Sequence, residues 1–386
     1  MNNSNFITFG KPLIDQDEIN EVLHSLQTSW LGTGPKVKRF ELDFARYKKI
    51  SNAVALNSCT AGLHLACLAL DLKEGDEVIT SAITFCATIN SIIHSGAKPV
   101  IADINPKTWN IDPKSIEEKI TDKTKAIIPV HFAGRACEMD SIMKLAKKYN
   151  LRVIEDCAHA IETEYKGKKA GAIGDFGVFS FYATKNIVTG EGGMVISNNS
   201  DKISKIKTLG LHGMSKDAWQ RFSDKGYKHY DVVDAGFKYN MMDLQAAIGI
   251  HQLKRVNEMS KKRKEIWEFY QKEFFNFPIE MAAEIEPNTK HAYHLFILRI
   301  DKKKCGFCRD EFLNMMNKIG IGCGVHYKAI PEYSFYKERF SWKIQDYNQA
   351  VKFGRETVSI PLSSGMSDSD VNRVTEGVKN IFNANK

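Results

Sequence analysis

The strongest fold signal is Val178-Phe-Ser-Phe-Tyr-Ala-Thr-Lys185-Asn-Ile-Val-Thr-Gly-Glu-Gly-Gly193, a strand-like segment that runs into a glycine-rich turn. Its apolar beginning predicts a buried strand. Lysine is rarely buried unless it is paired, and a desolvated lysine loses its proton more readily and becomes a nucleophile. We therefore predict that Lys185 is a reactive lysine, with a surface lysine on an ordinary loop as the alternative.

Short apolar strands alternate with helices on both sides of this segment. We expect strands at residues 53–57, 77–80, 98–102, 125–131, 151–155, 176–181 and 194–197, with helices at 60–70, 86–94, 115–120 and 139–149. This alternation predicts a mainly parallel α/β sheet covered on both faces. Ligands bind such sheets beyond the carboxyl ends of the strands. Polar or aromatic residues follow several of these strands and should meet at one edge, namely residues 57–60, Thr84, Phe85, His131, Asp156 and Lys185.

The two ends of the chain follow other patterns. Ile14, Ile19, Val22, Leu23 and Leu26 indicate an amphipathic helix, and a second helix is expected at 37–47. Beyond about residue 240 we expect helices at 244–256, 261–275, 309–318 and 369–381 and a strand at 293–299. We predict a large α/β domain at residues 1–245 and a small α+β domain at 246–386.

Composition excludes some classes of protein. The 386 residues carry a net charge of +8 without a recognisable nucleic-acid motif, so no nucleic-acid partner is expected. No apolar run reaches the roughly 18 residues of a membrane span, and the N-terminus lacks the features of a signal peptide, so we expect a cytoplasmic protein without membrane contact. Cys305 and Cys308 form a lone CxxC pair, which is weak support for zinc, and no metal is expected.

The residues around Lys185 match the separate needs of pyridoxal phosphate. Ser58-Cys-Thr-Ala-Gly62 lies between a strand and a helix, where backbone N–H groups bind phosphate. Ser and Thr also cap many helices without binding anything. Asp156 ends an apolar strand and is placed to keep a pyridine nitrogen protonated, although an aspartate there is also a routine helix cap. Glu155 should point the opposite way, because strand side chains alternate.

Three further residues complete this set. Phe85 is the candidate for covering the pyridine ring, His159 for contacting its phenolic oxygen, and Ser180 for reaching the phosphate. An isolated phenylalanine or histidine is more often structural. The order of the signals along the chain is stronger than any one of them.

Five motifs together resemble the DegT/DnrJ/EryC1/StrS family of sugar-nucleotide aminotransferases. They are Asn57-Ser-Cys-Thr-Ala-Gly62, Ile154-Glu-Asp-Cys-Ala-His-Ala160, Phe179-Ser-Phe-Tyr-Ala-Thr-Lys-Asn186, Gly190-Glu-Gly-Gly193 and Gly236-Phe-Lys-Tyr-Asn-Met241. The resemblance runs from Gly32 nearly to the C-terminus. Within the family it is greatest to the enzymes that make UDP-4-amino-4-deoxy-L-arabinose, through segments that include Ile128-Pro-Val-His-Phe-Ala-Gly134 and Gly324-Val-His-Tyr327.

The resemblance implies the type I aspartate-aminotransferase fold and a homodimer with active sites at the subunit interface. It implies that Lys185 forms the imine with pyridoxal phosphate and that Asp156 pairs with the pyridine nitrogen. The other implied cofactor contacts are Thr60, Ala61, Phe85, His159, Ser180 and, from the second subunit, Asn240. The implied substrate contacts are Lys238, His326 and Tyr327.

The implied activity is transfer of the amino group of L-glutamate to a nucleotide-linked 4-keto sugar, with UDP as the expected nucleotide and a surface glycan such as lipopolysaccharide or lipid A as the destination. A dTDP-linked 3-keto-6-deoxyhexose aminotransferase and a non-catalytic, cofactor-binding regulatory protein are the alternatives. A dehydratase of the same family would have histidine in place of Lys185. Phe85 stands where some close relatives have tryptophan, Tyr182 where they have histidine, and residues 219–234 form a variable loop, so the sugar stays open.

Overall fold

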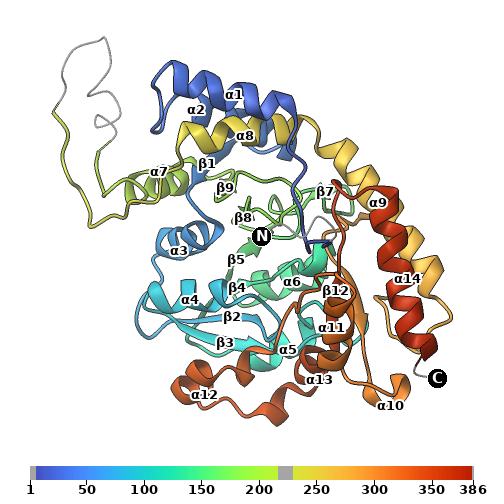
Figure 1. Cartoon of the computed structure of the whole chain (residues 1–386). Helices are drawn as coiled ribbons and strands as arrows, with labels where there is room; N and C mark the ends of the chain where they lie inside the picture. Colours follow the sequence, from blue (N-terminus) through green and yellow to red (C-terminus); the bar gives the residue numbers. More distant parts are fainter. Residues whose placement is uncertain (1–5, 216–228, 385–386) are drawn as a thin grey trace.

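A seven-stranded sheet forms the centre of the computed structural model, which describes residues 6–215 and 229–384 (Figure 1). Its strands are β1 Asn52–Leu56, β2 Glu77–Ser81, β3 Lys98–Ala102, β4 Thr124–Ile128, β5 Arg152–Asp156, β8 Phe176–Ser180 and β9 Gly193–Ser197. They are arranged in the order β1-β9-β8-β5-β4-β2-β3. The pairs β2–β3, β2–β4, β4–β5 and β5–β8 are parallel, whereas β9 runs antiparallel to β8 and β1. The predicted mainly parallel α/β sheet is confirmed, with β9 reversed.

Helices cover both faces of this sheet. The helices of the N-terminal two thirds are α1 Gln16–Gln27, α2 Pro35–Lys48, α3 Cys59–Ala69, α4 Cys86–His94, α5 Pro113–Lys119, α6 Met139–Lys148, α7 Ser200–Leu209 and α8 Asp243–Lys254. Val178 packs in a cluster with residues of α3 and α7, whereas the adjacent Phe179 packs with residues of α2 and α8. The alternation of strand side chains therefore buries both faces.

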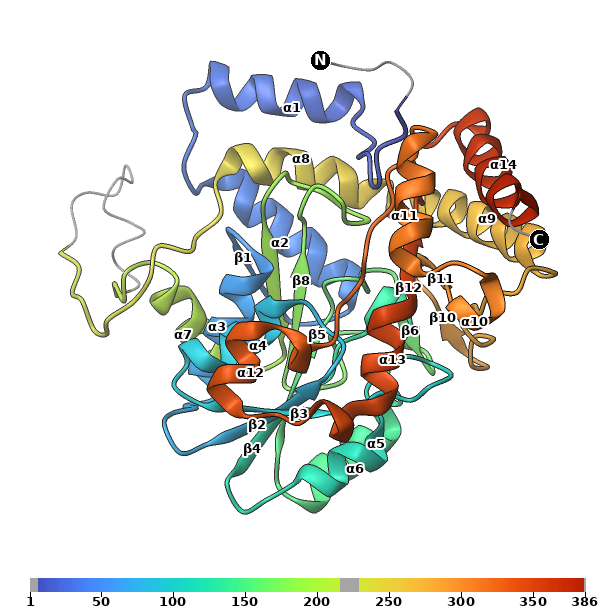
Figure 2. The ribbon, with the colours of Figure 1, turned by 60° about the horizontal axis from the view of Figure 1, so that its bottom comes forward.

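Helix α1 turns a polar side toward the protein. Glu18 is buried and accepts a hydrogen bond from Gln252 of α8 at 2.8 Å. Ile19, Leu23 and Leu26 are 45%, 47% and 52% exposed. Figure 2 shows α1 on the outside of the protein, with α8 and α2 beneath it. The helix expected near the N-terminus is present, but its apolar side chains do not enter the core of this chain.

The C-terminal part forms a second, smaller layer beside the sheet (Figure 1). Strands β11 Phe296–Arg299 and β12 Thr357–Ile360 pair antiparallel, and a short sheet joins β10 Thr289–Lys290 to the hairpin β6 Glu164–Tyr165 and β7 Lys168–Lys169. Its helices are α9 Val256–Phe274, α10 Lys302–Cys305, α11 Arg309–Lys318, α12 Ser334–Phe340, α13 Asn348–Glu356 and α14 Asp368–Ala384. One apolar cluster joins β11 and β12 to α9, α11 and α14.

One strand of this part starts later than predicted. The strand expected from Tyr293 begins at Phe296, because the N–H groups of His294 and Leu295 donate to the carbonyl of Ala133. The domain division at residue 245 stays a prediction, and α8 continues across that position and packs on α1 and α2. Residues 219–228 of the variable loop expected at 219–234 lie outside the described residues.

Among the described helices, none combines the length and apolar character needed to cross a membrane.

Candidate active site

A cavity of about 480 Å³ lies beyond the carboxyl ends of β5 and β8. It brings together seven of the residues predicted for the site, which are Thr60, Phe85, Asp156, Ser180, Lys185, His326 and Tyr327. They come from both the N-terminal and the C-terminal parts of the chain. The edge of the sheet at which the sequence predicted a site therefore carries a cavity of suitable size for a cofactor and part of a substrate.

Lys185 is held on the turn after β8, where its N–H donates to the carbonyl of Tyr182 at 2.8 Å. Its side-chain amine makes no hydrogen bond or ion pair with any residue that the structure describes. Desolvation lowers the pKa of this amine to about 8, although Cys59 and Asp156 act in the opposite direction. Such an amine is neutral often enough near neutral pH to act as a nucleophile.

Asp156 ends β5 with its carboxylate in the same cavity. Thr88 of α4 donates its hydroxyl to one carboxylate oxygen at 2.9 Å, and the N–H of Ala158 donates to the other at 3.1 Å. Burial raises the pKa of Asp156, and these two hydrogen bonds and Lys185 oppose that rise. The carboxylate is thus fixed in orientation, ready for a cationic partner in the cavity.

The N-terminus of α3 borders the cavity through Cys59 and Thr60. Ser58 caps this helix by accepting a hydrogen bond from the N–H of Ala61 at 3.1 Å. Gly193 approaches so closely that a Cβ there would lie 2.5 Å from the carbonyl oxygen of Ser58. Free amides at a helix N-terminus and the nearby hydroxyls of Thr60 and Ser180 suit a phosphate group.

Two aromatic rings stand at the cavity with large exposed surfaces. Phe85 is 56% exposed and Tyr182 is 47% exposed, and both line the cavity. Exposed aromatic surface beside a cavity is typical of a binding site. The free lysine, the oriented carboxylate, the helix N-terminus and Phe85 together fit the pyridine ring, phosphate and aldehyde of pyridoxal phosphate.

Of the other predicted residues, Ala61 does not line the cavity, because its N–H donates to Ser58, whereas His159 contacts a residue that does. His159 lies behind Tyr327, and both of its ring nitrogens are hydrogen bonded, to the N–H of Ala133 at 3.3 Å and to the Tyr327 hydroxyl at 3.0 Å. The Nδ1 atom of His326 lies 2.9 Å from the hydroxyl of Ser359, and burial lowers the pKa of His326 to about 3.

Asn240 and Lys238 do not reach the cavity of their own chain. Asn240 lines a different cavity of about 420 Å³, together with Trp30 and Lys207. Its Nδ2 donates to Thr33 at 2.6 Å, while its buried Oδ1 has no hydrogen-bond partner among the described residues. Lys238 is exposed.

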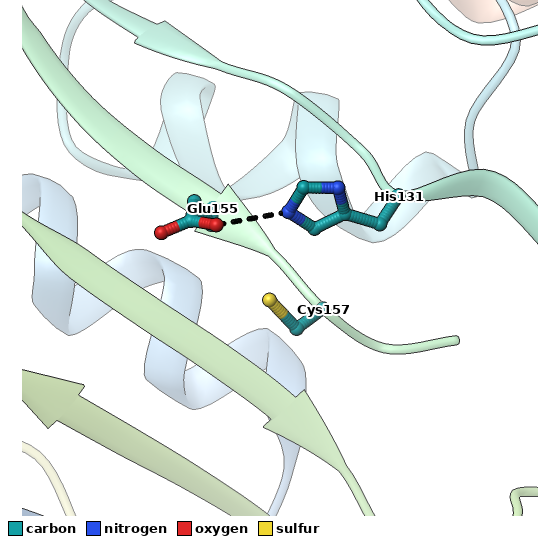
Figure 3. Close-up of side chains that lie close together, drawn as sticks. All are labelled: His131, Glu155 and Cys157. Atoms are coloured by element: carbon teal, nitrogen blue, oxygen red, sulfur yellow. Dashed lines mark hydrogen bonds and ion pairs between the residues drawn. The ribbon is translucent and has the colours of Figure 1, made fainter. Parts of the chain in front are cut away.

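One buried cluster has the composition of a metal site, but both ring nitrogens of its histidine are already hydrogen bonded. The side chains of His131, Glu155 and Cys157 offer ligand atoms within 4.8 Å of one another (Figure 3). Nδ1 of His131 accepts the N–H of Cys137 at 3.0 Å, so the ring proton is on Nε2, which faces Glu155 at 3.0 Å. The imidazole therefore has no lone pair free for a metal. Glu155 indeed points away from Asp156, as predicted.

Other contacts in the site were not predicted from the sequence. Thr88 lies on α4 and Asn186 follows Lys185, and each bonds to a residue that is remote in the sequence. The only signal for Thr88 in the sequence was its position, on the first turn of an expected helix and four residues after Thr84. Nothing in the sequence indicated that it would meet Asp156.

Comparisons with known proteins agree with this geometry. The model of the DegT/DnrJ/EryC1/StrS aminotransferase family matches residues 12–379. The spore coat polysaccharide biosynthesis protein SpsC of Bacillus subtilis (strain 168) is 46% identical over 379 residues, which cover 98% of this chain and 97% of SpsC.

Two solved structures are similar over nearly their whole length. Spr1654 of Streptococcus pneumoniae in its PLP form has a TM-score of 0.90 and 32% identity, covering 99% of this chain and 100% of that one. PseC of Helicobacter pylori, an aminotransferase involved in the biosynthesis of pseudoaminic acid, has a TM-score of 0.91 and 30% identity, covering 98% and 100%. The chain therefore belongs to the DegT/DnrJ/EryC1/StrS aminotransferase family and is a sugar aminotransferase that uses pyridoxal phosphate.

Proposed function

We propose that this enzyme transfers the amino group of L-glutamate to a UDP-linked 4-keto sugar and so produces a 4-amino sugar nucleotide. The observation that carries the proposal is the unpaired amine of Lys185 in one cavity with the oriented carboxylate of Asp156. The family supports the reaction class, and the resemblance of the sequence supports the sugar.

The residues divide the work of the cofactor site. Pyridoxal phosphate, when bound, supplies an electron sink that makes the proton on the amine-bearing carbon acidic. Asp156 holds the proton of the pyridine nitrogen, because an adjacent carboxylate favours the charged form. Thr60, Ser180 and the N-terminus of α3 bind the phosphate, and Phe85 covers the ring.

Lys185 is the residue that moves protons at the reacting carbon. With the cofactor bound, its Nζ would take the proton from Cα of glutamate as a general base and, as a general acid, would deliver it to the cofactor carbon that bears the transferred nitrogen. 2-Oxoglutarate leaves before the keto sugar enters, and Lys185 then performs the same transfers in reverse. A basic group whose pKa lies near the working pH suits both directions.

The sugar nucleotide is expected at the open side of the cavity. His326, Tyr327 and the exposed Tyr182 line the cavity. We propose a surface polysaccharide as the destination of the product, since the name of SpsC concerns a spore coat polysaccharide. Within that class, lipopolysaccharide and lipid A are the specific destinations that we propose.

We also propose a homodimer. Ile19, Leu23 and Leu26 on α1 are exposed, as are Trp30 and Leu31 just beyond it. An exposed apolar surface of this extent is typical of a protein interface. A second subunit placed there would bring Asn240, whose Oδ1 is unpaired, and Lys238 toward the other cavity.

A substrate panel tests the proposal. Purified enzyme with L-glutamate is offered UDP-, dTDP- and GDP-linked 4-keto and 3-keto sugars, and the products are identified by mass spectrometry. We expect an amine at C4 of a UDP sugar, and none with Lys185→Ala. Amination at C3 of a dTDP sugar would replace the substrate assignment. Bound cofactor without any transfer from glutamate would mean a non-catalytic protein, and wild-type turnover in Lys185→Ala would overturn the mechanism.

A further inference from the structure

Tyr327 places a buried phenol at the cavity, in a position that depends on His159. Tyr327 is 9% exposed, and its hydroxyl lies 3.0 Å from Nε2 of His159. The same tyrosine lines the cavity that contains Lys185 and Asp156, and its ring centroid lies 5.7 Å from that of Phe85.

The direction of the hydrogen bond between Tyr327 and His159 follows from the other side of the imidazole. The N–H of Ala133 donates to Nδ1 of His159 at 3.3 Å, so Nδ1 carries no proton. Burial, together with the charge of Lys185, lowers the pKa of His159 well below its usual value. The ring is therefore neutral with its proton on Nε2, and this N–H donates to the oxygen of Tyr327.

A second histidine packs on His159 and links it to the chain next to Lys185. The ring centroids of His159 and His294 are 4.3 Å apart. The Nδ2 of Asn186 donates to the carboxylate of Glu162 at 2.9 Å and to the carbonyl of Ala292 at 2.8 Å. Its Oδ1 must then accept from Nδ1 of His294, which lies 2.9 Å away. The orientation of His159 is thus determined by contacts on several sides.

The hydroxyl proton of Tyr327 therefore requires a hydrogen-bond acceptor in the cavity. Tyr327 already receives the N–H of His159, and no other described residue accepts its proton. Burial raises the pKa of Tyr327, so the phenol keeps this proton. The titratable groups around it are His159, His326, Asp156, Lys185, Cys59, Cys86 and Tyr333.

We propose that Tyr327 donates its hydroxyl proton to the phenolic oxygen of pyridoxal phosphate, and that His159 is a positioning residue that acts through Tyr327. This inference rests on the proposed function. The phenolic oxygen is adjacent, on the pyridine ring, to the carbon that carries the aldehyde, so its partner must lie near Lys185. His159 cannot serve as that partner in this arrangement, because both of its nitrogens are engaged.

The test is a pH titration of the visible absorbance of the cofactor-loaded enzyme without any substrate. A donor stabilises the anionic form of the oxygen and lowers the pKa of the bound cofactor. Loss of a hydrogen bond to a charged group should therefore raise that pKa by about one to two units in Tyr327→Phe. His159→Leu should raise it in the same direction, and His159→Gln, which keeps an N–H donor, should restore most of the wild-type value.

Tyr336→Phe is the matched control, because Tyr336 donates its hydroxyl to Asn90 at 2.7 Å and does not line the cavity. An unchanged titration in Tyr327→Phe, or an equal shift in Tyr336→Phe, would overturn the proposal. An effect on the KM of the keto sugar alone would overturn it as well. Because this titration needs no sugar, it gives its answer even if the substrate panel disproves the proposed function.

Discussion

Lys185 owes its reactivity to desolvation, and this makes a pH prediction. With a pKa of about 8, the amine is mostly protonated below pH 8 and mostly neutral above it. The rate at which the apo-protein binds pyridoxal phosphate should thus rise about tenfold per pH unit well below pH 8 and level off above it. Stopped-flow absorbance measures this rate, and Lys185→Ala should show no such phase. A midpoint near the ordinary lysine value of 10.5 would contradict the prediction.

The orientation of the Asp156 carboxylate depends on a neighbour, Thr88, which donates a hydrogen bond to it. Asp156→Asn should lower kcat by about 10²–10³-fold, as loss of a preorganised charge contact does in other enzymes. Thr88→Val removes one donor and leaves the carboxylate, so we expect a smaller loss of about three- to tenfold. Steady-state kinetics with glutamate measure both. Thr80→Val, which removes a buried hydroxyl bonded to Ile128 outside the cavity, should be nearly neutral in kcat. Equal losses of kcat in all three variants would show that kcat responds to the loss of any buried polar group, and not to the contacts of Asp156 in particular.

At the scale of elements, the phosphate site depends on close contact between β9 and the start of α3. A methyl group at Gly193 would overlap the backbone of Ser58 and Cys59 and push α3 away from the cavity. Gly193→Ala should therefore weaken cofactor binding at least about tenfold and lower the free energy of unfolding by about 1–3 kcal/mol.

Gly32→Ala is the control for the added methyl group, because no described residue other than its two chain neighbours has a heavy atom within 4 Å of a Cβ built there. Cofactor titration by fluorescence and urea unfolding measure the two effects. Wild-type affinity in Gly193→Ala would mean that the phosphate does not bind at this junction.

At the scale of the whole molecule, the exposed side of α1 predicts how two chains associate. Leu23→Asp places a charge in the proposed interface and should give a monomer. Cofactor binding should weaken as well, because the proposed contact of Asn240 with the cavity of the second subunit would be lost. Sedimentation equilibrium measures the assembly. Phe275→Asp is the control, since Phe275 is 77% exposed at the end of α9. A Leu23→Asp variant that remains a dimer at micromolar concentration would disprove this interface.

Local patterns in the sequence were sufficient for the sheet and for the centre of the site. Buried strands, the polar residues that follow them and the glycines after Lys185 are signals within a few residues of one another. They predicted the α/β fold and the meeting of Thr60, Phe85, Asp156 and Lys185 at one edge, whereas His131, expected there too, pairs with Glu155 and does not line the cavity. Strand alternation was also enough to separate Asp156 from Glu155.

Other features depend on partners far away in the chain. The reversal of β9, the polar contacts beneath α1 and the bond between His159 and Tyr327, 168 residues apart, have no local signature. A helical period shows that a stripe is apolar, but not whether the stripe meets the core or another molecule. The residue types around Lys185 therefore follow from the sequence, whereas the direction of each hydrogen bond follows from packing, because a donor can be assigned only when its neighbours in space are known.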